Sequence, residues 1–181
     1  MQFISEANRQ MHEEYLRTLK LEYSIYEKSY PDLVGKSLRE ITRLRFKNRG
    51  ELDSAVMKKC EIMAHELYFR SFGNPNSSSV KVRQAYGSEA DFLYEASEKC
   101  MSADGGFLLI YPDFRGRISM YAGREYKNVL LKFSPALALD LCEHAYFYDY
   151  SFDKKSYVSA ALSHIALERL MSSNLFGDNF K

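Results

Sequence analysis

The chain has 181 residues, 46% of them hydrophobic, and its 25 basic residues almost balance its 24 acidic ones. This length allows one compact domain, or two closely packed subdomains, with a buried core. The balanced charge argues against a nucleic-acid or membrane surface, and no stretch resembles a signal peptide or a membrane-spanning helix. We therefore expect a cytoplasmic protein with no nucleic-acid or membrane partner.

Cysteine and histidine are both scarce. The cysteines are widely separated and lack C-x-x-C spacing, which indicates neither a disulfide framework nor a structural zinc site; they are Cys60, Cys100 and Cys142. The four histidines are His12, His65, His144 and His164. With so few, the convergence of three histidines on one site would be informative.

A first long helix is predicted from about Ser5, a suitable N-cap, to Lys28, before Tyr30-Pro31 ends the helical pattern. Its inward-facing stripe comprises His12, Leu16, Leu19, Tyr23 and Tyr26. A lone histidine on such a stripe is more often a hydrogen-bonded core residue than a metal ligand. The stripe alone therefore leaves the role of His12 open.

Two serine-based patterns mark the starts of other helices. Ser37 and Glu40 form an S-x-x-E capping box, and Ser88 is expected to open a helix in the second half of the chain. Residues 48–50, N-R-G, are expected to break the chain before a second long helix, which we predict at about 51–72.

The second long helix carries a carboxylate and an imidazole one turn apart. Its shared face comprises Met57, Glu61, Ala64, His65, Tyr68 and Phe72. Glu61 and His65 could simply satisfy each other as an intrahelical pair. The pattern is therefore equally compatible with a structural pair and with a functional site.

Residues 73–79 are rich in turn formers and form the clearest linker in the sequence. We place the boundary there, between an N-terminal helical subdomain at residues 1–76 and a C-terminal subdomain at residues 77–181. Beyond it, three short β-prone runs, at 106–111, 117–121 and 129–133, predict a small three-stranded antiparallel sheet.

The third predicted strand leads to Asp140, near a strand-to-helix crossing, and to His144 on the first helical turn beyond it. These two residues could also satisfy each other across one turn. A last helix is expected at about 155–173, with an inward face of Tyr157, Ala161, Leu162, Ile165 and Leu170. His164 is interpreted as an ordinary surface or packing residue.

Five segments resemble motifs of the iron/manganese superoxide dismutase family. The resemblance covers nearly the whole chain, from Ile4 to about Ser173. Ile4-Ser5 and His12 match I-S-x(6)-H, residues 35–41 match G-K-S-L-x-E-I, 65–69 match H-x-x-Y/F-W/F, 86–92 match F-G-S-x-x-D/A-F, and 140–146 match D-x-W-E-H-A-Y with Cys142 in place of Trp.

The resemblance implies a fold and a metal site. The fold is α+β, with a long antiparallel helical hairpin followed by an α/β subdomain with a three-stranded antiparallel sheet. The implied ligands of one manganese or iron ion per chain are His12, His65, Asp140 and His144. Three neutral nitrogens and one anionic oxygen suit such an ion and differ from a closed thiolate zinc site. The implied reaction converts superoxide to dioxygen and hydrogen peroxide, while the ion alternates between trivalent and divalent states.

Several positions near the implied metal depart from the family pattern. Leu16 and Lys20 occupy the places of a His and a gateway Tyr, Glu61 that of a solvent-binding Gln, and Cys142 that of Trp. Glu61 could be ionised, could imitate the amide when protonated, or could bind the metal itself, and Lys20 could attract superoxide. We take Glu61 and Lys20 as candidate catalytic residues.

Three functions stay open at this point. The leading one is a divergent manganese- or iron-dependent superoxide dismutase. The second is a metal-binding relative with remodelled surroundings and little or no dismutase activity, serving another redox or structural role. The third is a scaffold that keeps the fold for assembly, which the four filled ligand positions disfavour. Glu143 and Tyr146 occupy positions that imply a homodimer with the two sites adjoining its interface.

Overall fold

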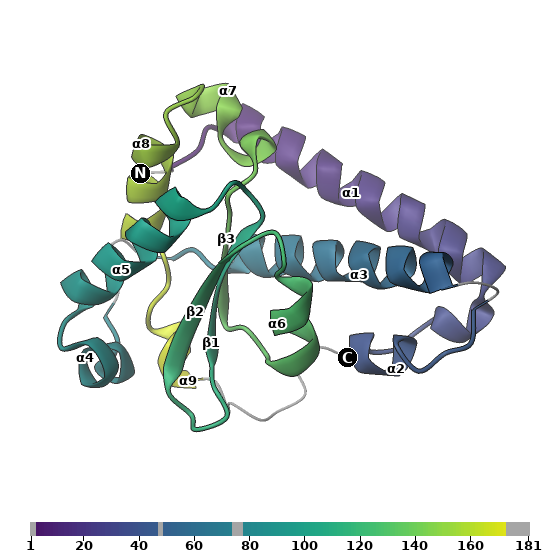
Figure 1. Ribbon diagram of the computed structural model, residues 1–181. Helices are drawn as coiled ribbons and strands as arrows, with labels where there is room; N and C mark the ends of the chain where they lie inside the picture. The colour runs from purple at the N-terminus through teal and green to yellow at the C-terminus, as the bar shows by residue number, and fades with distance from the viewer. Residues whose placement is uncertain (1–2, 47–48, 74–77, 173–181) are drawn as a thin grey trace.

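The computed structural model describes residues 3–46, 49–73 and 78–172, and it places a long pair of helices beside a three-stranded sheet covered by further helices (Figure 1). The predicted α+β class with an antiparallel three-stranded sheet is confirmed. None of the described helices combines the length and apolar character needed to cross a membrane. The predicted boundary between residues 76 and 77 lies outside the described residues and stays a prediction.

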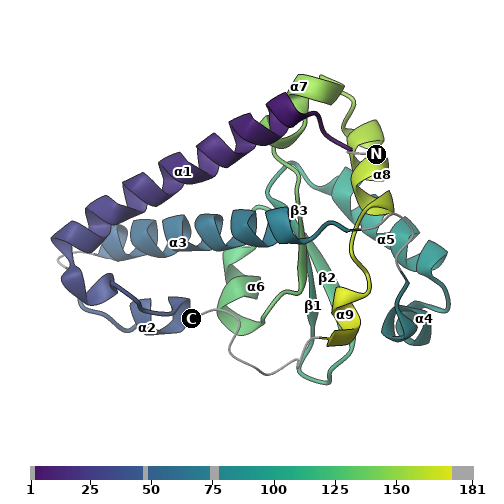
Figure 2. The same cartoon turned by 180° about the vertical axis from the view of Figure 1, so that it is seen from behind.

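The long helices α1 (Glu6–Ser29) and α3 (Arg49–Arg70) run antiparallel and side by side in both views (Figures 1 and 2). As predicted, Ser5 caps α1, because its side chain accepts a hydrogen bond from the backbone N–H of Asn8. The predicted helical hairpin is therefore present, and His12, Leu19 and Tyr23 of its predicted inward-facing stripe are buried.

Two short elements, η1 (Pro31–Leu33) and α2 (Leu38–Ile41), connect the long helices, and the predicted capping box at the start of α2 is formed. The predicted break at residues 48–50 is wrong for residues 49 and 50, which form the first turn of α3; residue 48 lies outside the described residues. N–H groups in a first turn have no partner within the helix, so a glycine costs little there.

The sheet has β1 (Phe107–Pro112) at its centre, paired antiparallel with β2 (Ile118–Gly123) and with β3 (Leu137–Asp140). Helix α5 (Glu89–Ser102) packs against β1 and β2, while α3 packs against β3. As a result, the first four residues of β1 are at most 2% exposed. The residue immediately before β1, Gly106, must be a glycine, because a Cβ there would lie 2.1 Å from a backbone oxygen of β2.

The predicted third strand at 129–133 is wrong. Most of this run belongs to helix α6 (Lys127–Lys132), which packs against α3, and the third strand is β3. Tertiary contact thus overrides the β-propensity of the run. All four residues of β3 are buried, so its sequence, Leu-Ala-Leu-Asp, lacks the alternation and the β-branched residues that mark a strand.

Within the described residues 78–172, the fold contains four more α-helices and one 3-10 helix. Helix α4 (Val80–Tyr86) precedes α5, whose predicted N-cap Ser88 accepts a hydrogen bond from the backbone N–H of Asp91. After β3, η2 (Glu143–Ala145) and α7 (Phe147–Tyr150) lead to the C-terminal helices. The predicted Ser88 cap is therefore confirmed.

The predicted last helix at 155–173 is interrupted, forming α8 (Lys154–Ser163) and α9 (Arg169–Ser172); residue 173 lies outside the described residues. Between them the extended chain pairs with the end of α3, where Phe72 and Ile165 form an isolated β-bridge. Gly73 N–H donates to the His164 carbonyl at 3.0 Å. These long-range hydrogen bonds are more favourable than continuing the helix through residues 164–168. All five residues predicted to face inward are nevertheless buried.

Candidate metal centre

Four side chains from distant parts of the sequence meet where α1, α3 and the end of β3 come together. They are His12 of α1, His65 of α3, Asp140 of β3 and His144 of η2. One potential ligand atom from each lies within 4.8 Å of all the others. We call these four residues the His-Asp cluster, and it is the one such group found among the described residues.

The end of β3 fixes the position of Asp140. The Tyr157 hydroxyl donates to the Asp140 carbonyl at 2.8 Å, and Cys142 N–H donates to Asp140 Oδ1 at 2.8 Å. Asp140 is fully buried, and His12 and His65 are each 1% exposed. In contrast, one-third of the His144 side chain is exposed. The cluster is therefore enclosed on three sides and open at His144.

Asp140 Oδ2 is the point on which the three imidazoles converge. It lies 3.2 Å from His12 Nε2, 3.3 Å from His65 Nε2 and 2.9 Å from His144 Nε2. His65 Nε2 and His144 Nε2 are themselves 3.3 Å apart. One carboxylate oxygen and three ring nitrogens thus face the same small volume.

The hydrogen bonds of His65 indicate which kind of group would fit between these atoms. Its Nδ1 lies 2.7 Å from the Glu61 carbonyl oxygen, which can only accept, so Nδ1 carries the proton. In the neutral ring, Nε2 is then a bare lone pair facing a carboxylate oxygen. Both ring nitrogens of His12 are buried and lack a hydrogen-bond partner among the described residues. A ring nitrogen lone pair that faces a carboxylate oxygen favours a cation, either a proton or a metal ion, between the two atoms, so the residues fit a metal ion.

The charges of the cluster support the same conclusion. Burial opposes ionisation of Asp140, but the three histidines hold the pKa of its carboxyl well below 3.8. Burial lowers the pKa of His12 despite the opposing effect of Asp140. In His65, burial is outweighed by Asp140, which raises the pKa above 6.5. In the absence of metal, a proton on His65 would therefore compete for the same place as a metal ion.

Tyr15 is a site residue that the sequence reasoning missed. Its ring centroid lies 4.4 Å from that of His144 and 5.3 Å from that of His65, and its hydroxyl donates to Glu61 Oε1 at 2.8 Å. Burial and this hydrogen bond raise the pKa of Tyr15. The available signal was its place three residues after His12, since i and i+3 share a helix face.

Glu61 stands outside the His-Asp cluster, with its carboxylate turned to other partners. Oε1 accepts from Tyr15, and Oε2 lies 3.7 Å from Lys58 Nζ, which also pairs with Glu22 at 2.7 Å. Burial opposes protonation of Lys58, but the two carboxylates raise its pKa. The Glu61 side chain therefore accepts a hydrogen bond and faces an ammonium, away from the cluster.

Lys20, the other candidate catalytic residue, lies on the surface. Its ammonium is 2.7 Å from Glu66 Oε1, and half of its side chain is exposed. An ion pair of this kind offsets the charge that an approaching anion would meet. Its suggested role in attracting superoxide stays a prediction.

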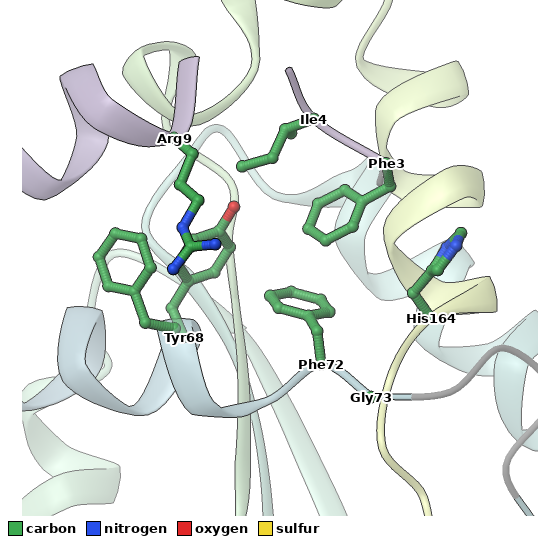
Figure 3. A pocket seen from close by; sticks show the side chains of 8 residues that line it. Phe3, Ile4, Arg9, Tyr68, Phe72, Gly73 and His164 are labelled. Carbon is green, nitrogen blue, oxygen red and sulfur yellow. The ribbon is translucent and has the colours of Figure 1, made fainter. Parts of the chain in front are cut away.

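A separate pocket of about 290 Å³ lies between the start of α1, the end of α3 and His164 (Figure 3). Its lining residues include Phe3, Arg9, Tyr68 and Phe72, and none of the His-Asp cluster. The centroid of the His12 ring lies 4.7 Å from that of Tyr68 and 5.0 Å from that of Phe69. Tyr68 and Phe69 therefore both line the pocket and contact His12 of the cluster.

Comparison with known proteins gives consistent matches. A model of the C-terminal domain of iron/manganese superoxide dismutases matches residues 75–172. Superoxide dismutase (Fe) of Cupriavidus metallidurans is 31% identical over 173 residues, covering 83% of this chain and 84% of that protein. Superoxide dismutase (Mn) 1 of Halobacterium salinarum is 31% identical over 103 residues, covering 53% and 52%, respectively. Superoxide dismutase (Fe) 2, chloroplastic, of Oryza sativa subsp. japonica is 22% identical over 168 residues, covering 82% and 66%.

Proposed function

Because the chain belongs to the iron/manganese superoxide dismutase family, we propose that it converts superoxide to dioxygen and hydrogen peroxide. The proposed site is the His-Asp cluster, holding one manganese or iron ion. The observation that carries this proposal is the convergence of three imidazole nitrogens on one oxygen of the buried, ionised Asp140. A bound ion of this type would supply the one-electron redox chemistry.

The residues around the cluster would control access and proton position. Since His12, His65 and Asp140 are enclosed, the partly exposed His144 marks the side from which superoxide would approach. Tyr15 stands on that side against the His144 ring, with its phenolic proton held toward Glu61 Oε1. Exclusion of water on the other sides strengthens the interaction of Asp140 with positive charge.

The test is the rate of superoxide decay per bound metal, measured by pulse radiolysis on protein loaded separately with manganese and with iron. We expect decay faster than with the same amount of free metal, and loss of bound metal in Asp140→Asn. His164→Ala is the matched control, because His164 lies outside the His-Asp cluster. A fully metallated chain that does not exceed free metal would contradict the proposal.

A second candidate function, metal binding with little or no dismutase activity, is favoured by one observation. Glu61 places a carboxylate, held by Tyr15, at the position where the family pattern has a Gln. Under this alternative, the native chain binds one metal but does not turn over, and Glu61→Gln gains activity. Turnover by the native chain would reject it.

We also propose a homodimer in which Glu143 and Tyr146 adjoin the interface. Exposed aromatic side chains beside η2 support this arrangement: Phe147 is 46% exposed, Tyr148 61% and Phe152 82%. The Tyr146 ring is buried against Tyr157, at a centroid distance of 4.9 Å, so it would support the interface from within. Sedimentation velocity at micromolar concentration should give the mass of two chains; a single-chain mass would contradict the dimer.

A further inference from the structure

We propose that the pocket between the start of α1 and the end of α3 binds a small aromatic carboxylate, with the carboxylate on Arg9 and the ring among the aromatic walls. The site lies outside the His-Asp cluster, because none of the four cluster residues lines it. The inference therefore goes beyond the proposed dismutation and does not depend on it.

Most of the residues that line the pocket are aromatic. Phe3 and Phe72 pack against each other at a centroid distance of 4.4 Å, and the Tyr68 ring meets Phe72 edge to face at 5.1 Å. A flat ligand ring can pack against such walls in an offset or edge-to-face arrangement. Ligand pockets usually hold roughly 300–1,000 Å³, so a pocket of about 290 Å³ suits a ligand with a single ring.

Arg9 supplies a positive charge at the edge of the pocket. Figure 3 shows its side chain reaching from α1 toward Tyr68 on α3, and half of the Arg9 side chain is exposed to solvent. Its Nε donates to Glu13 Oε1 at 3.0 Å, whereas its two terminal nitrogens form no hydrogen bond or ion pair within the described residues. The terminal edge of the guanidinium is therefore available to a second carboxylate, which it can bind through two parallel hydrogen bonds.

The charge of the lining residues selects the class of ligand. Among the described residues, no Asp or Glu lines the pocket, and Arg9 is the one lining side chain with a permanent charge. A single carboxylate matches one guanidinium, whereas a phosphate dianion would leave charge unpaired against apolar walls. Glu13 competes for the same guanidinium without lining the pocket, so it should weaken binding in the native chain.

These contacts predict opposite effects of two neighbouring changes. Arg9→Gln removes the positive charge and should weaken the binding of benzoate about tenfold. Glu13→Gln removes the competing carboxylate and should strengthen the binding of benzoate about threefold. Because misfolding cannot raise affinity, the second variant separates the loss of a contact from damage to the fold.

The experiment is isothermal titration calorimetry of benzoate into the full chain and its variants, with and without bound manganese. Benzoate should bind in both states, because the pocket lies outside the His-Asp cluster. Benzamide keeps the ring without the charge, and acetate keeps the carboxylate without the ring, so both should bind at least about tenfold more weakly. Arg17→Gln is the matched control on α1 and should leave benzoate affinity unchanged, because Arg17 pairs with Glu14 and does not line the pocket.

Three results would overturn the inference: no saturable binding of benzoate, equal behaviour of Arg9→Gln and Arg17→Gln, or acetate binding as tight as that of benzoate. The readout is independent of turnover, so the inference and the proposed function can fail separately. Benzoate binding by a chain that does not dismutate superoxide would keep the pocket and remove the proposed activity. Turnover by a chain that does not bind benzoate would do the reverse.

Discussion

A single proton on His65 determines how the cluster responds to pH. Its Nδ1–H is committed to the Glu61 carbonyl, so only Nε2 can take up a proton or a metal ion. Since Asp140 raises the pKa of His65 above 6.5, metal-free protein would be protonated there even above pH 6.5. Protons and metal ions therefore compete near neutral pH.

We predict that the apparent affinity for manganese falls as the pH is lowered, starting above pH 6.5. The sign follows from the raised pKa, because each step toward lower pH increases the fraction of His65 that must lose a proton before binding. Isothermal titration calorimetry between pH 6 and 8 would measure it, with proton release detected from the buffer dependence of the heat. An affinity that does not change over this interval would contradict the prediction.

The three cysteines provide a second prediction for individual residues. Burial raises the pKa of Cys60, Cys100 and Cys142 to about 12, so their thiols stay protonated at pH 8. Because the thiolate is the nucleophile, alkylation by iodoacetamide should be slow in the native protein and fast in urea. Mass spectrometry of timed samples would show this; rapid native labelling of Cys142, the least buried of the three, would contradict it.

Among the secondary-structure elements, the features that depend on neighbouring residues were predicted from the sequence. The features that depend on contacts between distant residues were not. Caps at Ser5, Ser37 and Ser88 depend on side chains bonding to the next turn, and all three were predicted correctly. Strand β3 was missed because burial on both faces removed its alternation. The end of α8 was missed because the bridge to Phe72 lies far away in sequence.

The candidate site likewise contains residues that were predicted from the sequence and one that was not. The four cluster residues were identified from the motif resemblance, and the structure brings them together. Tyr15 was missed because its contact with Glu61 depends on how α1 crosses α3, which spacing within one helix does not encode. The relatives and the cluster support the predicted manganese or iron cofactor, whereas the roles of the individual ligands and of Glu61 and Lys20 stay predictions.

The start of α1 is held to α7 by Asp149, which provides a prediction for these elements. Asp149 Oδ2 accepts from Ser5 N–H at 2.7 Å and from Asn8 Nδ2 at 3.1 Å. Burial opposes ionisation, but these bonds lower the pKa of Asp149 below 3.8. Asp149→Asn should lower the free energy of unfolding by about 1 kcal/mol at pH 6, a modest value because the site is exposed.

This contribution depends on pH, with a sign fixed by the lowered pKa. It is fully present above the unfolded pKa of about 3.8 and is lost as the pH falls through the lower folded value. The free energies of unfolding of the native chain and of Asp149→Asn, measured by urea denaturation, should therefore differ at pH 6, and the difference should shrink as the pH falls below 3.8. A difference that persists at the acid end would show that ionisation of Asp149 is not its cause.

For the whole molecule, the cluster links the helical hairpin to the C-terminal half, because two of its residues come from each. A bound ion should therefore stabilise the fold by mass action, by about 4 kcal/mol at a free metal concentration 1,000 times Kd. Calorimetry should show a higher Tm with metal than with a chelator, and no such difference in Asp140→Asn. An equal rise in that variant would place the stabilising ion elsewhere.

The distribution of the cluster along the chain also has a consequence for biosynthesis. A ribosome delivers His12 and His65 well before Asp140 and His144, and the strand partner of Phe72, Ile165, emerges later still. A nascent hairpin would offer an ion only two imidazoles, which hold it weakly and let it exchange. Metal selection would thus be decided only after Asp140 and His144 have been synthesised, by the ions available at that stage rather than by those present when the helical hairpin forms.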